Sequence, residues 1–235
     1  MSWPLLLTPF VPLLAAVPGG RWALPLLAPL TLWLAFRERV KEGDYYRAWV
    51  LGVVWAGLLS LGVIVLVLWL PDAARGGIWH GEAYRQEMFG WIATGEAAEN
   101  HPRRFIPQHL LHLVIFLALT WASGGYLGLV LGAALVAYMS YFVGSYAAAS
   151  GHPWLGAVAA WVPWSVVRVG AFVLLGTLFA RPLLVRRAWP FGRREIRLMA
   201  LAALGLVADV AIKTLGAPAY GRFLRQMARS AAGLG

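Results

Sequence analysis

Residues 49–70 read "WVLGVVWAGLLSLGVIVLVLWL", an apolar run without a single charged residue. A helix of about 20 apolar residues is long enough to cross the hydrocarbon core of a bilayer. Trp49 and Trp69 bracket the run, and Trp is enriched where a transmembrane helix meets the two membrane surfaces. The run therefore predicts a membrane-spanning helix.

The composition of the whole chain agrees with that prediction. The sequence is 60% hydrophobic and 13% charged, with a mean hydropathy of +0.68. A soluble domain of this composition would expose a largely apolar surface. Four more apolar runs occupy residues 107–123, 125–148, 154–180 and 196–216. We expect an all-α, polytopic membrane helix bundle with five transmembrane helices, forming one integral membrane domain over residues 1–235.

The net charge of +10 and the absence of cysteine limit the function further. No soluble basic domain is predicted, so we expect the lipid bilayer, and not nucleic acid, as the partner of the basic residues. A chain without cysteine has no disulfide, no thiolate metal site and no cysteine nucleophile.

Residues 1–36 differ from the other apolar segments. They contain six of the 14 prolines, and Arg21 divides them into two pieces that are each short for a membrane span. We expect one or two short Pro-rich hydrophobic segments here, as a tight helical hairpin or as a re-entrant element.

Basic residues that flank the spans predict the orientation. The segments "FRERVKEGDYYR" (36–47) and "RPLLVRRAWPFGRREIR" (181–197) fall on one side, which should be the cytoplasmic side of a bacterial-type inner membrane. Residues 71–108 then form an extracytoplasmic loop, with a helix over 82–94 lying on the outer leaflet. The C-terminal "GRFLRQMAR" (221–229) is a basic patch that opposes this orientation.

A first candidate site lies in "ENHPRRFIPQHLLH" (99–112). His109 and His112 share one face at the start of a predicted helix, and the "SGHP" turn returns His152 to the same membrane level. Glu99 and His101 would supply further ligands. Imidazoles with a carboxylate suit a divalent metal or acid–base chemistry at the outer face, and His152 must then be a neighbour of the pair.

The alternative interpretation of this stretch is structural. Interfacial histidines would lie at headgroup level, while Arg103 and Arg104 contact lipid phosphates and Pro107 marks the entry into the helix. A haem is not expected, since a transmembrane haem requires ligands deeper in facing helices.

A second candidate site consists of charges inside the apolar runs. At 1.5 Å per residue, Arg168 and Asp209 lie roughly 18 Å and 20 Å above the inner ends of their helices, so they are predicted at similar depth. Lys213 follows one turn after Asp209. Such charges face a bundle interior, a cavity or one another. One interpretation is a structural Arg168–Asp209 pair with Lys213 snorkelling outward; the other is a net positive site for an anionic group.

The segment "RRFIPQHLLHLVIF" resembles the rhomboid intramembrane proteases, in which an Arg-containing motif leads into a helix that carries a functional His. The resemblance covers residues 100–150. It implies intramembrane proteolysis, but Phe116 stands where the family has Asn, residues 154–180 contain no G-x-S-G, and Lys213 stands where the family's last helix has its His. The Ser/His catalytic pair is therefore missing.

Two functional hypotheses follow. The first is a small transporter, permease subunit or membrane-complex assembly partner, with partner subunits or a second copy, that recognises an anionic or lipid-like group through Arg168, Asp209 and Lys213. The second is a membrane-interface enzyme, a metal- or His-dependent hydrolase or transferase that acts on a lipid-linked or lipoprotein substrate. Small residues at 125, 128, 132, 140 and 144 predict close helix packing.

Overall fold

A computed structural model describes residues 3–231, and every regular element in this range is helical. The two 3₁₀ helices are η1 (Trp3–Ala16) and η2 (Ala98–Asn100). The α-helices are α1 (Gly20–Leu27), α2 (Leu30–Glu42), α3 (Tyr45–Trp69), α4 (Pro71–Gly77), α5 (Gly81–Thr94), α6 (Pro102–Ser123), α7 (Tyr126–Ala149), α8 (Pro153–Ala160), α9 (Pro163–Leu184) and α10 (Arg193–Ala231).

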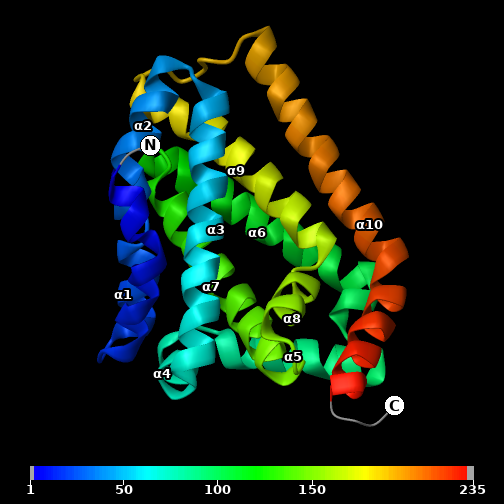
Figure 1. Cartoon of the computed structure of the whole chain (residues 1–235). Helices are drawn as coiled ribbons and strands as arrows, with labels where there is room; N and C mark the ends of the chain where they lie inside the picture. The colour runs from blue at the N-terminus through cyan, green and yellow to red at the C-terminus, as the bar shows by residue number, and fades with distance from the viewer. Residues whose placement is uncertain (1–2, 232–235) are drawn as a thin grey trace.

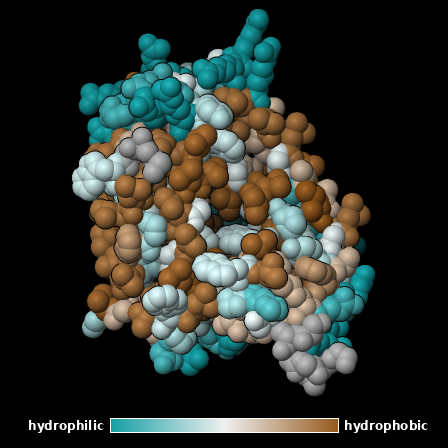
Figure 2. Space-filling model, in the orientation of Figure 1, coloured by the Kyte–Doolittle hydropathy of each residue, from teal (hydrophilic) through white to brown (hydrophobic). Residues whose placement is uncertain are grey.

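Five helices of the described chain, namely α3, α6, α7, α9 and α10, are long and apolar enough to cross a membrane. The molecule has hydrophilic residues at two opposite ends and a hydrophobic surface between them (Figure 2). Large apolar side chains are exposed on this middle surface, among them Val114 at 64% and Leu215 at 82%. Such a surface is stable in lipid and is a liability in water. The predicted class, an all-helical membrane bundle, is confirmed.

The two ends of the bundle differ in content. We call the end that carries residues 36–47 and 181–197 the basic end, and the opposite end, with residues 70–101, the loop end (Figure 1). At the basic end, the Tyr45 hydroxyl donates to Glu195 at 2.8 Å, and Arg181 contacts both residues. These bonds join the ends of α3, α9 and α10.

The N-terminal segment forms a hairpin against α3. Leu5 of η1 is buried with residues of α2 at the basic end, whereas Ala15 is buried with residues of α3 and α4 at the loop end. The chain then returns through α1 and α2. Gly62 makes this close packing possible, because a Cβ at that position would lie 2.2 Å from the Pro9 carbonyl oxygen.

The predicted span 154–180 is wrong as a single helix. The structure divides it into α8 and α9, with Val162 in an extended conformation at φ −61° and ψ 135°. Pro163 explains the break, since a residue before proline is disfavoured in the α conformation and Pro suits the first position of a helix. The short α8 packs against the loop end of α7.

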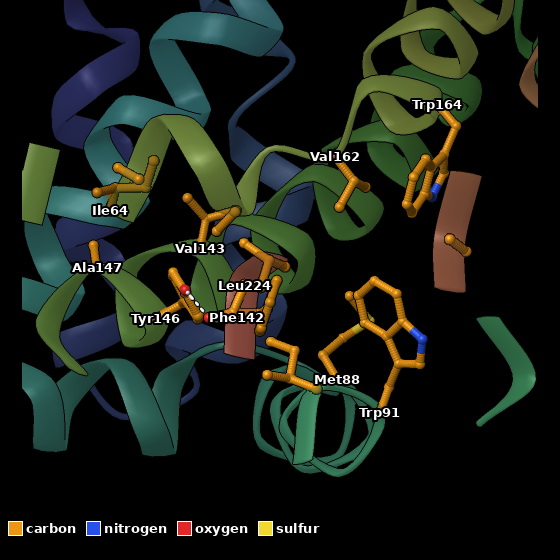
Figure 3. Close-up of a cluster of buried hydrophobic side chains, with 14 residues drawn as sticks. Ile64, Met88, Trp91, Phe142, Val143, Tyr146, Ala147, Val162, Trp164 and Leu224 are labelled. Atoms are coloured by element: carbon orange, nitrogen blue, oxygen red, sulfur yellow. Dashed lines mark hydrogen bonds between the residues drawn. The ribbon is translucent and has the colours of Figure 1, made fainter. Parts of the chain in front are cut away.

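The helix expected to lie on the outer leaflet exists as α5, but its apolar stripe faces protein. Met88, Trp91 and Ile92 are buried in a cluster with residues of α7, α9 and α10, such as Phe142 and Leu224 (Figure 3). The Tyr146 hydroxyl also donates to the Leu224 carbonyl at 2.7 Å. The stripe therefore holds the loop end of the bundle together.

One ion pair fixes the polar face of α5 as well. Arg85 donates to Glu82 through Nε at 2.9 Å and through Nη2 at 2.5 Å, and Tyr141 of α7 donates to the same carboxylate at 3.0 Å. The hydrogen bonds from Arg85 lower the pKa of Glu82 to about 2 despite partial desolvation.

Candidate functional site

Arg168 of α9 and Asp209 of α10 form a bidentate ion pair inside the bundle. Arg168 Nε lies 2.9 Å from Oδ2 of Asp209, and Nη2 lies 2.8 Å from Oδ1. The Asp209 side chain is only 3% exposed. The pairing that the similar depths of the two residues predict is therefore present. The bonds use Nε and Nη2, which leaves Nη1 outside the pair.

Lys213, which one interpretation of the sequence expected to snorkel outward, forms an ion pair with Glu99. It does not snorkel outward: it is 1% exposed, and its Nζ lies 3.0 Å from Oε1 of Glu99 in η2. The same ammonium lies 4.2 Å from the ring centroid of Phe105, a cation–π geometry. Thus the η2 turn, which belongs to the loop end, is tied to the interior of α10.

This partner changes the charge of the region. The expectation of a net positive site counted Arg168 and Lys213 against Asp209 alone. Glu99 supplies a second carboxylate at 3.0 Å from Lys213, so the four groups together carry two positive and two negative charges. The four groups therefore leave no net positive charge for an anionic ligand.

His109 lies next to the Arg168–Asp209 pair. Its Nδ1 is 3.8 Å from Oδ2 of Asp209, too long for a hydrogen bond, and this buried nitrogen has no hydrogen-bond partner among the described residues. The Phe105 ring covers one side of the imidazole at 5.3 Å between ring centroids. His109 thus has one buried polar atom without a partner among the described residues.

The start of α6 explains this position. α6 begins at Pro102, before the Pro107 entry that the sequence indicated, so Arg103 and Arg104 occupy its exposed first turn. His109 and His112 therefore lie roughly 10 Å and 15 Å along the helix from its first residue. Their spacing places both on the face of α6 that turns toward α9.

A cavity opens beside the two histidines, between α3, α6, α7 and α9. The volume that the centre of a water-sized molecule can occupy within it is about 100 Å³. The loop end of the cavity is polar, with His109, His112, Tyr138 and Arg168 in its lining, while the remainder is mainly apolar. The apolar lining comprises Trp55, Phe116, Leu129, Leu135, Val136, Met139, Val169, Phe172 and Val173.

Along α6 the cavity extends from His109 to Thr120, roughly 16 Å at the helical rise. Thr120 Oγ1 is a second buried polar atom without a partner among the described residues. Gly132 of α7 lines the cavity and would have open space around an added Cβ, whereas Gly128 contacts Thr120. Among the small residues of α7, Gly132 therefore shapes the cavity and Gly128 permits close helix packing.

The other candidate residues are dispersed. His101 lies at the N-cap position of α6 with its Nε2 3.3 Å from Glu96, and Glu99 is held by Lys213. His152 is exposed at the N-cap position of α8 and is absent from the cavity lining. Across residues 3–231, no group of three or more His, Asp or Glu side chains is arranged to hold a metal ion. The structure does not bring the five proposed ligands together.

Sequence reasoning missed two features of the site. Glu99 was expected to be a metal ligand, and no local pattern reveals that it pairs with Lys213, because the residues are far apart in the chain. Tyr138 was not singled out from the sequence, but it lines the cavity together with His109 and Arg168. The sequence signal available for this site was the spacing of Phe105, His109 and Phe116, which places the three residues on one face of α6.

Comparison of the chain with protein-family models, with curated proteins and with solved structures found no match.

Proposed function

We propose that the protein binds a single-chain, lipid-like molecule inside the membrane, with the chain of the ligand in the apolar part of the cavity and its small polar head at the loop end. The observation that carries the proposal is the cavity itself, which is apolar over most of its length and ends at His109, His112 and Arg168. Small-molecule sites are typically concave and mainly apolar, with a few polar groups that orient the ligand.

The chemistry of the polar end limits which head groups the cavity can accept. The two buried ion pairs balance one another, which favours a hydrogen-bonding head such as a hydroxyl or carboxyl group over a multiply charged one. Arg168 Nη1 is available as a donor, and His109 brings a buried nitrogen that lacks a partner. A buried polar atom without a partner costs free energy, so a ligand that bonds to it gains affinity.

Filling the cavity tests the proposal. Gly132→Leu places a side chain in open space within the cavity, while Gly57→Leu makes the same change at an exposed position of α3 that also has open space around it. The wild type and the two variants are purified in a mild detergent, and their bound lipids are extracted and identified by mass spectrometry. We expect a single-chain amphiphile at near-equimolar amount with the wild type and Gly57→Leu, reduced at least tenfold with Gly132→Leu.

Equal lipid content in all three proteins would refute binding in the cavity. The thermal unfolding midpoints of the two variants serve as the folding control, because each adds the same side chain in membrane-embedded helix.

A second candidate function is catalysis on the bound molecule, and one observation favours it. His109 lies beside Asp209, which Arg168 clamps, and its imidazole lines the cavity that would hold the substrate. An imidazole oriented near a carboxylate is suited to general acid–base chemistry. If the protein is an enzyme, the His109→Gln variant retains an unreacted precursor that the wild type converts. Lipids extracted from the variant and from the wild type should then differ. The same lipid on both proteins supports binding or transport without chemistry.

For location, we propose the inner membrane, with the basic end in the cytoplasm and the whole chain as one membrane domain. The excess of Arg at residues 181–197 supports this orientation. The exposed Arg103 and Arg104 in the first turn of α6 are suited to contact lipid phosphates at the loop end.

A further inference from the structure

The basic patch near the C-terminus, Arg222, Arg225 and Arg229, lies at the loop end, where the orientation rule expects few cations. Arg222 follows Lys213 along α10 by roughly 13 Å of helical rise, beyond the buried charges. This part of α10 lies beside α5 and the turn that follows it, since Arg225 donates through Nε to the Ile92 carbonyl at 2.5 Å. The patch is therefore part of a folded surface and not of a loose tail.

Two of these arginines line a small pocket between α5, η2 and α10. The pocket also includes Thr94, Gly95 and Asn100, and its empty volume is about 490 Å³ including its opening. Unlike the central cavity, its lining is mainly polar, and no acidic residue contributes to it. It is separate from the site of the proposed lipid-like ligand, with which it shares no lining residue.

The hydrogen bonds of the pocket leave cationic donors free. Trp91 donates to Asn100 Oδ1 at 3.0 Å, and Asn100 donates in turn to the Gly95 carbonyl, so both Oδ1 and Nδ2 of the amide have a partner within the protein. Arg225 uses Nε for the end of α5, which leaves its two Nη groups. Arg222 forms no hydrogen bond or salt bridge within residues 3–231.

Neighbouring arginines at the same end behave differently. Arg85 pairs with Glu82 at 2.5 Å, and Arg75 lies 4.0 Å from Asp72. Within the described chain, neither Arg222 nor Arg225 has a carboxylate at salt-bridge distance. The pocket is therefore a site where two guanidinium groups converge without an anion from the protein.

We propose that this pocket binds a phosphate group through Arg222 and Arg225. Guanidinium groups match the geometry of phosphate oxygens and form charge-assisted hydrogen bonds with them. At the loop end, near the level where the apolar surface stops, two sources carry this chemistry: the phosphate of a lipid headgroup and free phosphate in solution. A bound phosphate also explains why α10 ends in cations on this side.

Binding to the purified full-length chain tests the proposal. Isothermal titration calorimetry in an uncharged detergent uses inorganic phosphate, dihexanoylphosphatidic acid and, as the control, dihexanoylphosphatidylcholine, whose phosphate is masked by a quaternary ammonium. Binding of both phosphate and the phosphatidic acid supports recognition of the phosphate itself. Binding of the phosphatidic acid alone supports a membrane lipid as the source. Binding of neither, or equal binding of the phosphatidylcholine, overturns the proposal.

Two matched variants locate the site. Arg222→Gln should weaken binding about tenfold or more, because a hydrogen bond to a charged group is worth roughly 1.4 kcal/mol or more, a factor of ten in affinity. Arg229→Gln removes the same charge from an exposed position of the same patch outside the pocket, and it should bind as the wild type does. Equal losses in both variants, or none in Arg222→Gln, would show that diffuse charge and not the pocket attracts the anion.

Discussion

Each buried charge inside the bundle lies beside an opposite charge from another element. Arg168 and Asp209 join α9 to α10, and Lys213 and Glu99 join α10 to η2. Burying a charge in a membrane is costly, so an unpaired ion would destabilise the fold. A pair recovers most of this cost, and for that reason the partner is a structural requirement even where the pair also forms one end of a binding cavity.

The Arg168–Asp209 pair predicts a specific pattern of stability. Arg168→Leu or Asp209→Leu alone should lower the free energy of unfolding by about 3–5 kcal/mol, because each leaves one buried charge without its partner. The double variant should be more stable than either single variant. Denaturant unfolding of the four proteins in detergent measures these differences. A double variant as unstable as the sum of the single variants would contradict the coupling.

Glu82 predicts a dependence on pH at the loop end. Its pKa in the folded protein is about 2, below the value of about 4.3 in an unfolded chain. The pair with Arg85 therefore contributes stability fully above pH 4.3, and this contribution is lost as the pH falls from about 4.3 to about 2. The thermal unfolding midpoint, measured between pH 2 and 6, should therefore depend less on pH in Glu82→Gln than in the wild type.

Glu87→Gln serves as the control, since Glu87 is exposed on the same helix and forms no salt bridge among the described residues. An unchanged pH profile in Glu82→Gln, or an equal change in both variants, would contradict the assignment.

At the scale of elements, α5 illustrates how far the sequence predicts the fold. The stripe of Met88, Trp91 and Ile92 correctly predicted an amphipathic helix, because periodicity depends only on local spacing. Its apolar face meets α7, α9 and α10 instead of lipid, and periodicity carries no information about which apolar partner covers a helix. The same limit applies to η1, whose packing against α3 depends on Gly62.

The elements around the site were likewise predictable from local sequence, whereas their packing partners were not. Hydropathy identified the five long helices that form the cavity walls or hold the ion pairs, but it did not detect the break before Pro163, since both halves are apolar. The depth of Arg168 and Asp209 was predictable from helical rise. The pairing of Lys213 with Glu99 was not, because it depends on how a loop folds back over α10.

The packing of α5 predicts a local effect of one side chain. Trp91→Ala should destabilise the protein by about 3–5 kcal/mol, because it leaves a cavity in the core and removes the hydrogen bond to Asn100. Hydrogen exchange should rise first in residues 81–100. Trp154→Ala is the matched control, as Trp154 is 67% exposed at the same end. Equal exchange in both variants would show that the Figure 3 cluster does not hold α5.

At the scale of the whole molecule, the orientation of the bundle is testable because the chain contains no cysteine. Ala93→Cys and Ala188→Cys each introduce a single thiol at an exposed position, the first at the loop end and the second at the basic end. In cells whose outer membrane has been removed and whose inner membrane is intact, a membrane-impermeant maleimide should label Ala93→Cys. Ala188→Cys should react only after the inner membrane is opened. The opposite labelling would reverse the proposed orientation.

The cavity involves most of the long helices of the bundle. Its walls come mainly from α3, α6, α7 and α9, with Phe36 of α2, and its polar end lies beside ion pairs that reach α10 and η2. A ligand in this cavity would therefore contact most of the long helices at once. Its head would lie at the loop end, under the turn that Glu99 and Lys213 hold in place.

Photocrosslinking shows which residues a bound single-chain ligand contacts. A single-chain fatty alcohol with a diazirine in its chain is added to the protein in bilayers, irradiated, and mapped by peptide mass spectrometry. Binding in the cavity predicts labels on the lining residues Leu135, Met139, Val169 and Phe172, and their loss in Gly132→Leu. Labels confined to exposed surface residues such as Val114 and Leu215, unchanged by Gly132→Leu, would contradict the account.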